Sequence, residues 1–315
     1  MTGPDSPLTV VEFTDPACPW AWGSEPKFQR LRAALDGRAH WRRVFGILFD
    51  DCDDPPPDPA AEAAWYHQEL REISTHTAAP CPERLTRVAA SSWPASLACK
   101  AAEAQGPDVA HAVLRRLRET TFLDGEPADT PERVNRALDG LAGLDAAELA
   151  RAAASPEVLE AVRRDWAETR APSAEVLRIT TPGRHNGQAK PLGEDPSDGY
   201  RYALPTLVFT GPAGRAVVLA GARWSSTLTR CARSLRAPRS GTPKVRDLRR
   251  PGSQAIRHFD VSIDSGAQSR HHELHDPDTP RRGLPLRRLQ AHLQRPVLPG
   301  TAYLKALPSR GARVR

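Results

Sequence analysis

The first fifty residues carry the hydrophobic pattern of a strand, a helix and a second strand. Residues 8–14 hold the β-branched and aromatic side chains of a buried strand. Apolar residues at spacings of three and four then predict a helix over 22–35, which Asp36-Gly37 ends. A further apolar run predicts a strand over 40–49. Two strands joined through one helix predict a βαβ unit with a right-handed crossover.

A long block with helical periodicity follows this unit. Residues 50–59 are acidic and rich in proline, which marks a boundary. Thr130 and Ser155 are each followed by a proline and then an acid, an order typical of helix starts. Apolar spacing predicts helices over 60–74, 82–90, 94–105, 108–123, 134–144, 145–153 and 158–169. We therefore predict an all-helical block.

The strand pattern returns after residues 172–202, which are polar and rich in turn residues. Pro205 stands at the start of an apolar strand that runs to Phe209, because proline cannot donate within a ladder. A loop over 211–214 and a partner strand over 216–219 complete a hairpin. Strands therefore bracket the helical block.

Composition and charge divide the chain into a body and a tail. Hydrophobic residues make up 39% of the chain and prolines number 31, so part of it is expected to lack stable structure. The net charge of +6 hides a split: residues 224–315 hold 19 basic and 6 acidic residues, whereas the rest has a net charge of −7. We expect this tail to be disordered or translated out of frame. It lacks interleaved aromatic residues and a recognisable module, so no specific nucleic-acid partner is predicted.

The cysteine usage and the absence of targeting signals indicate a cytoplasmic protein. No apolar run is long enough to cross a membrane, and the N-terminus lacks the pattern of a secretory signal. Cysteines at 18, 52, 81, 99 and 231 form neither a disulfide framework nor a paired metal spacing. The histidines at 271, 272 and 275 do not match the metalloprotease motif, so no metal site is predicted.

Cys18 is the residue whose position alone points to chemistry. It follows the turn residues Asp15-Pro16 and precedes Pro19, which fits the first turn of a helix. Unpaired N–H groups and the helix dipole at such a place favour a thiolate, the nucleophilic form of cysteine. Glu12, on the preceding strand, is expected to face solvent.

The order of motifs resembles the DsbA-like thioredoxin-fold proteins, in particular the FrnE-type predicted dithiol-disulfide isomerases. The residues that carry the resemblance are Asp15-Pro16-Ala17-Cys18-Pro19-Trp20, the helical insert, and Leu204-Pro205-Thr206. The resemblance implies that Cys18 is the attacking thiol, and that Pro19 and Trp20 shape the start of the helix. It also implies that Pro205 is a cis-proline against the cysteine, so that Leu204, Pro205 and Thr206 bind the substrate.

The resemblance also implies the fold class, an α/β thioredoxin-like fold with a large inserted helical domain and a poorly structured basic tail. Residues 1–52 and 203–223 would form the two halves of the thioredoxin-like domain. Residues 53–202 would form the helical insert with its return loop, and 224–315 the tail.

One residue departs from the family pattern. Members with redox activity carry Cys-x-x-Cys, whereas Ala21 stands at the second position here. A lone cysteine forms a mixed disulfide but cannot resolve it. Three outcomes are open: release by a small thiol such as glutathione or mycothiol, release by another cysteine such as Cys52, or loss of redox function.

Function is accordingly predicted as thiol–disulfide oxidoreductase or isomerase activity through Cys18, on a protein or small molecule that carries a thiol or disulfide. No bound cofactor is expected. One alternative is an enzyme like the kappa-class glutathione transferases or 2-hydroxychromene-2-carboxylate isomerases, which use a small thiol. A second is a non-catalytic binding protein. The sequence does not determine the oligomeric state.

Overall fold

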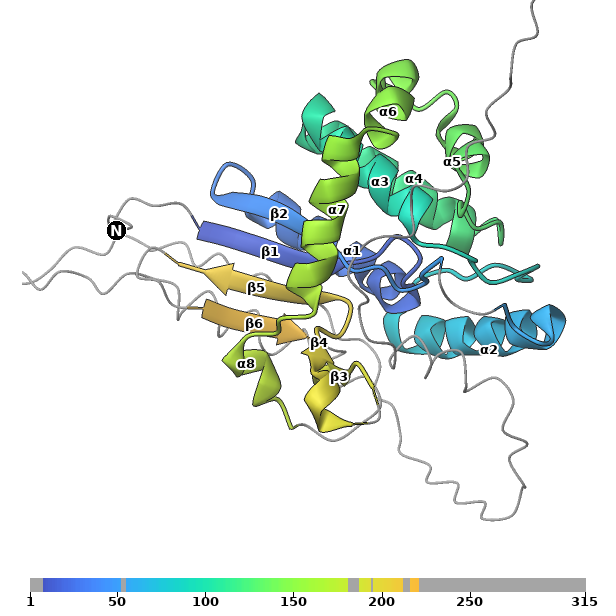
Figure 1. The fold of residues 1–315 in the computed structure, drawn as a ribbon. Coiled ribbons are helices and arrows are strands. Elements are labelled where there is room, and N and C mark those ends of the chain that lie inside the picture. Colours follow the sequence, from blue (N-terminus) through green and yellow to red (C-terminus); the bar gives the residue numbers. More distant parts are fainter. Residues whose placement is uncertain (1–7, 52–54, 181–186, 194, 212–215, 221–315) are drawn as a thin grey trace, which may run out of the picture. The chain divides into compact units, whose positions relative to one another are not determined.

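A computed structural model describes residues 8–51, 55–180, 187–193, 195–211 and 216–220 (Figure 1). The elements, in chain order, are β1 Leu8–Thr14, α1 Pro19–Ala34, β2 Ala39–Phe45, α2 Pro59–Thr77, α3 Trp93–Ala102, the 3-10 turn η1 Glu103–Gln105, α4 Pro107–Phe122, α5 Pro131–Leu138, α6 Ala146–Ala153, α7 Pro156–Thr169, α8 Ala174–Leu177, β3 Lys190–Pro191, the 3-10 turn η2 Pro196–Asp198, β4 Tyr200–Arg201, β5 Thr206–Thr210 and β6 Ala216–Ala220.

A four-stranded sheet with the order β2-β1-β5-β6 joins the two ends of this region. β1 runs parallel to β2 and antiparallel to β5, and β5 pairs antiparallel with β6. The predicted βαβ unit and hairpin thus belong to one sheet, and the helices α2 to α8 lie between β2 and β5 in sequence. β3 and β4 form a separate two-stranded hairpin just before β5.

Strand alternation explains how the sheet is covered. Val10 and Phe209 point to one face and pack with Phe28 of α1. Phe13 and Tyr202 lie on the other face, where their rings stack at 3.8 Å between centroids. Figure 1 shows α7 crossing that second face of the sheet. β1 is therefore covered on both sides, which fits its run of apolar residues.

The helical block has its own core, made by the apolar faces of α3, α4, α5 and α6. Leu114, Leu117 and Leu138 are each 1–2% exposed, and burial of one such side chain contributes about 1.5–3 kcal/mol. The predicted caps are confirmed: Thr130 Oγ1 accepts from Arg133 N and Ser155 Oγ from Val158 N.

The helix predicted over 82–90 is wrong, because residues 78–92 form an irregular segment. Prolines at 80 and 82 lack the backbone N–H groups that a helix would need. Other elements of the fold form hydrogen bonds with the backbone of this segment. The indole of Trp22 donates to Pro80 O at 2.7 Å, and Ala90 N donates to the Asp129 carboxylate at 2.7 Å. These tertiary contacts replace the internal backbone hydrogen bonds that a helix would form, so the segment stays irregular.

Some predicted bounds also shift. The first helix begins at Pro19, and the second strand ends at Phe45. Beyond this strand, Phe49 exchanges hydrogen bonds with Ser92 of the helical block and not with the sheet. α5 ends at Leu138, before Gly140 at φ +70°. Cys52, Cys231, the histidine cluster and the tail over 224–315 lie outside the described residues. None of the described helices is both long and apolar enough to span a bilayer.

Candidate functional site

Cys18 lies at the junction of β1 and α1, as the sequence predicts. It is the N-cap residue of α1, with an extended backbone, and Pro19 occupies the first helical position. Its amide donates to the carbonyl of Asp15 at 3.2 Å, which closes the turn. Its thiol donates to the carbonyl of Leu204 at 3.5 Å, although 186 residues separate the two in sequence. The helical insert thus returns the chain to the cysteine.

The thiol is protonated in this setting, which corrects the expected thiolate. Cys18 is 4% exposed, and burial raises the pKa of its thiol to about 11. The N–H groups of Ala21 and Trp20 lower this pKa, as expected at a helix start, and the nearby Asp15 raises it. Desolvation therefore raises the pKa of the thiol by more than the N–H groups at the helix terminus lower it. The helix start is thus where predicted and lowers the pKa of the thiol as predicted, but burial raises that pKa by more.

Asp15 ties the cysteine turn to two other parts of the chain. Its fully buried carboxylate accepts from Ala17 N at 2.7 Å, from Leu48 N at 2.8 Å and from Ser92 Oγ at 3.2 Å. Burial raises the pKa of this carboxyl to about 6, and the three hydrogen bonds lower it. One side chain thus links the turn, the end of the second strand and the helical block.

The loop facing Cys18 holds the other predicted site residues. The Leu204–Pro205 peptide bond is cis, as the resemblance implied. Leu204 and Trp20 are partly exposed, whereas Pro205 and Thr206 are buried. The Thr206 hydroxyl donates to Ala203 O at 2.6 Å, so this side chain holds the loop and does not offer a free polar group. Binding of substrate by these residues stays a prediction.

Ala21 fills the place of a second thiol. Its side chain is fully buried, one helical turn beyond Cys18. Cys81 and Cys99 are also free in the structure, and burial raises the pKa of Cys99 to about 12. Ala21 has no thiol that could resolve a mixed disulfide at Cys18. Among the described residues, no cysteine is bonded to Cys18.

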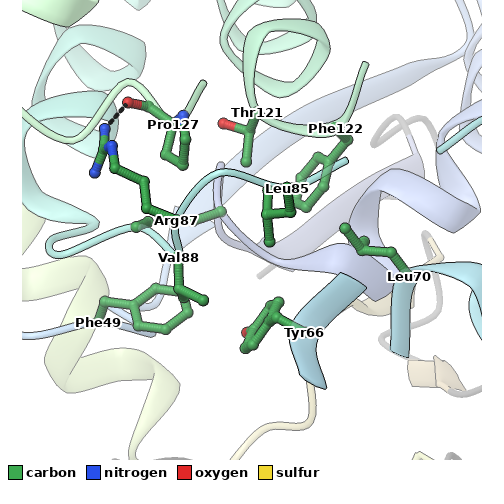
Figure 2. A pocket seen from close by; sticks show the side chains of 11 residues that line it. Phe49, Tyr66, Leu70, Leu85, Arg87, Val88, Thr121, Phe122 and Pro127 are labelled. Carbon is green, nitrogen blue, oxygen red and sulfur yellow. Dashed lines mark hydrogen bonds between the residues drawn. The ribbon is translucent and has the colours of Figure 1, made fainter. Parts of the chain in front are cut away.

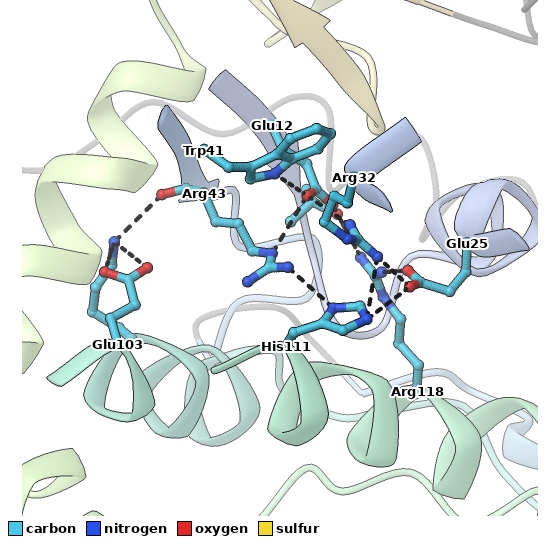
Figure 3. Close-up of polar contacts among 10 residues, drawn as sticks. Glu12, Glu25, Arg32, Trp41, Arg43, Glu103, His111 and Arg118 are labelled. Atoms are coloured by element: carbon cyan, nitrogen blue, oxygen red, sulfur yellow. Dashed lines mark hydrogen bonds and ion pairs between the residues drawn. The ribbon is translucent and has the colours of Figure 1, made fainter. Parts of the chain in front are cut away.

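Glu12 is buried, so its predicted solvent-facing position is wrong. Figure 3 shows it beside Arg43 and Trp41 of β2 and Arg32 of α1. The Trp41 indole donates to Glu12 at 2.9 Å, and Arg43 Nε lies 3.4 Å from the carboxylate. Glu12 and Arg43 are also partners in the parallel register of β1 and β2. A buried acid is held here by cations that come from other elements.

The same cluster continues to α4 (Figure 3). Arg118 is fully buried and donates to Glu25 Oε2 and to Thr14 Oγ1, each at 2.6 Å. Burial acts to raise the pKa of Glu25, but Arg118 and Arg32 outweigh it and the pKa is lowered. We name Glu12, Glu25, Arg32, Arg43, His111 and Arg118 the charge cluster.

His111 sits among the cations of the charge cluster. Its ring nitrogens lie 3.4 Å from Arg32 Nη2 and 3.2 Å from Arg43 Nη2. Burial, followed by the charge of Arg32, lowers the pKa of this imidazole to about 4. His111 is therefore neutral at pH 7, and the cluster holds three guanidinium groups against two carboxylates.

An apolar pocket opens next to the cysteine turn (Figure 2). It is small, with about 10 Å³ of free space, roughly the room that one water molecule needs, and Ala17 contributes to its wall. Phe49, Tyr66 and Phe122 supply aromatic surface. Arg87 lines the rim, but its guanidinium is bound to Pro127 O and the Asp129 carboxylate. The pocket is therefore a small apolar hollow beside the cysteine turn, and Arg87 offers no free charge to it.

The sequence indicated Cys18 and Pro205 but missed the supporting charges. Asp15 belongs to the motif, yet nothing in its neighbours indicates that its carboxylate is buried. Opposite charges at matching positions of two predicted strands, as in Glu12 and Arg43, could have indicated an ion pair. Arg118 gives no such signal, because its partners come from distant elements. The part of the chain described here contains no group of three or more His, Cys, Asp or Glu side chains arranged to bind a metal.

Comparison with known sequences gives one family and one set of relatives. A family model described as thioredoxin matches residues 12–172. A ClpXP adapter protein SpxH from Shouchella clausii is 30% identical over 165 residues, which cover 50% of this chain and 52% of the relative. The SpxH of Halalkalibacterium halodurans is 29% identical over 174 residues, with 52% and 55% covered. The chain thus spans about half the length of these curated relatives.

Solved structures share the fold at low sequence identity. A candidate protein disulfide isomerase from Nitrosomonas europaea aligns with a TM-score of 0.54 and 13% identity, over 73% of this chain and 97% of the other. The cytosolic disulfide reductase DsbM from Pseudomonas aeruginosa aligns with a TM-score of 0.51 and 19% identity, over 72% and 99%. The predicted thioredoxin-like fold with inserted helices is confirmed, and so is the resemblance to DsbA-like proteins.

Proposed function

The chain belongs to the thioredoxin family, and we propose that it catalyses thiol–disulfide exchange with Cys18 as its single reacting thiol. The observation that carries this proposal is the contact between Cys18 Sγ and Leu204 O, 3.5 Å apart at the start of α1. This contact places the thiol against a loop in which Leu204 is partly exposed. An extended peptide or a small disulfide can approach there and present a sulfur to Cys18.

The proposed reaction needs an external thiol. The Cys18 thiolate attacks one sulfur of a disulfide, a bond forms between the two sulfurs, and the other sulfur leaves as a thiolate that takes up a proton. A small thiol then attacks the mixed disulfide and releases Cys18 as a thiolate. The first molecule of the small thiol is then joined to the substrate sulfur in a new mixed disulfide. A second molecule of the small thiol reduces that bond, so the substrate leaves as a thiol and the small thiol leaves as its disulfide. Ala21 cannot resolve the intermediate, so we assign the release of Cys18 to the external thiol rather than to another cysteine of the chain such as Cys52.

The protonated thiol sets the expected speed. With a pKa of about 11, about one Cys18 in ten thousand is a thiolate at pH 7. Exchange with a free small disulfide should therefore be slow at neutral pH and rise about tenfold per pH unit up to pH 10. We further propose that the reaction takes place in the cytoplasm, where thiols stay reduced and can supply the releasing step.

Intact-mass spectrometry after incubation with oxidised glutathione tests this proposal. The wild type should gain one glutathionyl group, and Cys18→Ser should lose it. Cys99→Ser is the matched control, because it removes a buried thiol elsewhere in the fold and should keep the adduct. Equal labelling of wild type and Cys18→Ser would show that exchange does not use Cys18.

A second candidate function is that of a non-catalytic binding protein, in keeping with the SpxH relatives, which are named as adapters. The buried thiol of raised pKa and the missing second cysteine favour it. The discriminating measurement is alkylation of Cys18 by iodoacetamide across pH. Rates that climb steadily toward pH 10 in the folded protein favour exchange. Cys18 that stays unmodified until the protein unfolds favours the binding function.

A further inference from the structure

Two cations face each other in the hairpin that leads to the Cys18 loop. Lys190 of β3 and Arg201 of β4 are direct partners in the antiparallel register, so their side chains lie on one face of the hairpin. Like charges at such positions repel. Both residues are partly buried, and among the described residues neither has a carboxylate oxygen within 4.0 Å. Within the described part of the chain, neither cation is thus paired directly with a carboxylate.

Arg170, which follows the end of α7, is a third cation near Arg201. Tyr202 N donates to Thr169 O at 2.8 Å, and the Tyr202 hydroxyl accepts from Ser173 N at 3.0 Å. These two bonds hold the chain after α7 against the residue that follows Arg201, near β4 (Figure 1). Arg170, in that segment, stacks on the Trp166 ring at 4.3 Å. The charge of Arg170 acts on Arg201, so the two guanidinium groups are close enough to repel.

Arg201 is the cation of this pair that lies near the cysteine. Arg201 precedes Leu204 by three residues, and Leu204 O accepts from the Cys18 thiol. Arg201 Nη1 donates to Tyr202 O at 3.0 Å, so the guanidinium lies along the backbone of the Cys18 loop. Burial lowers the pKa of Arg201 to about 10, and the Cys18 side chain offsets this most. Arg201 therefore stays charged at pH 7 and acts on the reacting sulfur.

We propose that Lys190 and Arg201 form an anion subsite that binds a carboxylate of the small thiol or disulfide that reacts at Cys18. The proposal rests on the proposed function and names its co-substrate class, a low-molecular-weight thiol that carries a carboxylate. A planar guanidinium binds a carboxylate through two parallel hydrogen bonds, and an ammonium beside it adds charge. Glutathione has this chemistry, with carboxylates on either side of its sulfur. Mycothiol, which has no carboxylate, cannot use the subsite.

The test compares two disulfides that differ in charge. Oxidised glutathione carries carboxylates, and bis(2-hydroxyethyl) disulfide is neutral. The rate constants for modification of Cys18 by each are measured by mass spectrometry, and their ratio is the readout. A ratio removes any effect of a substitution on the thiol itself, because both probes share that factor. Arg201→Gln should lower the ratio about tenfold, and Arg201→Lys should lower it less. Arg178→Gln, which removes the exposed arginine that follows α8 as its C-cap residue, is the control of equal charge change and should leave the ratio near the wild-type value.

A binding measurement separates failure of the subsite from failure of the proposed function. S-methylglutathione cannot exchange, so its binding to Cys18→Ser by calorimetry does not depend on redox activity. Binding that weakens about tenfold when Arg201→Gln is added supports the subsite, even if Cys18 proves unreactive. Absence of S-methylglutathione binding, or binding unchanged by Arg201→Gln, overturns the proposal. A ratio of rate constants unchanged by Arg201→Gln would overturn it as well.

Discussion

The turn around Cys18 and the charge cluster both bury acidic groups, but the pKa values of these groups shift in opposite directions. Asp15 and Glu12 are equally inaccessible, with no exposed surface. In the turn, burial raises the pKa of Asp15 to about 6 and that of Cys18 to about 11, because few charges oppose it. In the charge cluster, Arg118 and Arg32 overcome burial and lower the pKa of Glu25.

This difference shows that the partner, and not depth alone, decides the charge state of a buried group. A buried ion needs an opposite charge and hydrogen bonds, or else it becomes neutral. The charge cluster joins β1, β2 and α1 to α4, so it fixes the insert on the sheet by ion pairs. The cysteine turn is held by hydrogen bonds to one carboxylate and keeps its thiol neutral.

The largest effect is expected from breaking the charge cluster at its centre. Arg118→Ala removes the partner of Glu25 and Thr14 and leaves a buried carboxylate without its main cation. Loss of one partner of a buried ion pair costs about 3–5 kcal/mol. Urea denaturation should therefore show a loss of this size in the free energy of unfolding.

A double variant distinguishes charge from packing in this result. Arg118→Met with Glu25→Gln removes both charges and keeps side-chain volume. It should be more stable than Arg118→Ala alone, because residue 25 is then neutral and no longer needs Arg118, while Arg32 keeps Glu12 as a partner. If the double variant is as unstable as the single one, the ion pair is not what holds the cluster.

The next effect lies in the pH dependence of stability, where the two regions oppose each other. Asp15 has a pKa of about 6 in the folded state and about 4 when unfolded, so the folded state binds a proton first as the pH falls. Protonation thus favours folding between pH 6 and 4. His111 has a folded pKa of about 4 against about 6.5 unfolded, so protonation there favours unfolding.

Two variants make these opposite slopes visible. From pH 7 to pH 4 the wild type should gain about 2 kcal/mol relative to Asp15→Asn, and should lose a similar amount relative to His111→Gln. Urea denaturation at a series of pH values measures both differences. Asp36→Asn, at an exposed carboxylate, is the control for a general charge effect. Parallel curves for wild type and Asp15→Asn would contradict the raised pKa.

Local signals predicted the elements that carry the site. The strand over 8–14 has the predicted bounds, and the caps Thr130 and Ser155 are where proline and acid followed them. Cys18 at a helix start and Pro205 before a strand were also readable, because turn and cap residues act within a few positions. The family resemblance then joined these two distant points into one site.

The rest depends on contacts that a local pattern does not contain. Residues 82–90 have helical spacing, yet Asp129 binds Ala90 N and the Trp22 indole binds Pro80 O just before this segment, which keeps the chain irregular there. The N–H groups at the start of α1 do lower the pKa of Cys18, but burial raises it by more. Glu12 looked solvent-facing because its cations come from β2, α1 and α4.

The smallest effect is expected from an exposed arginine one turn away from Arg118 on the same helix. Arg115 Nε lies 2.7 Å from Glu119 Oε1, and the Arg115 side chain is 52% exposed. Water screens such a pair, so Arg115→Ala should change the free energy of unfolding by less than about 0.5 kcal/mol, and less again at high salt. Urea denaturation beside Arg118→Ala gives the comparison within one experiment. A loss above about 1 kcal/mol would show that burial is not what separates the two arginines, because their ion pairs are of nearly equal length and differ mainly in exposure.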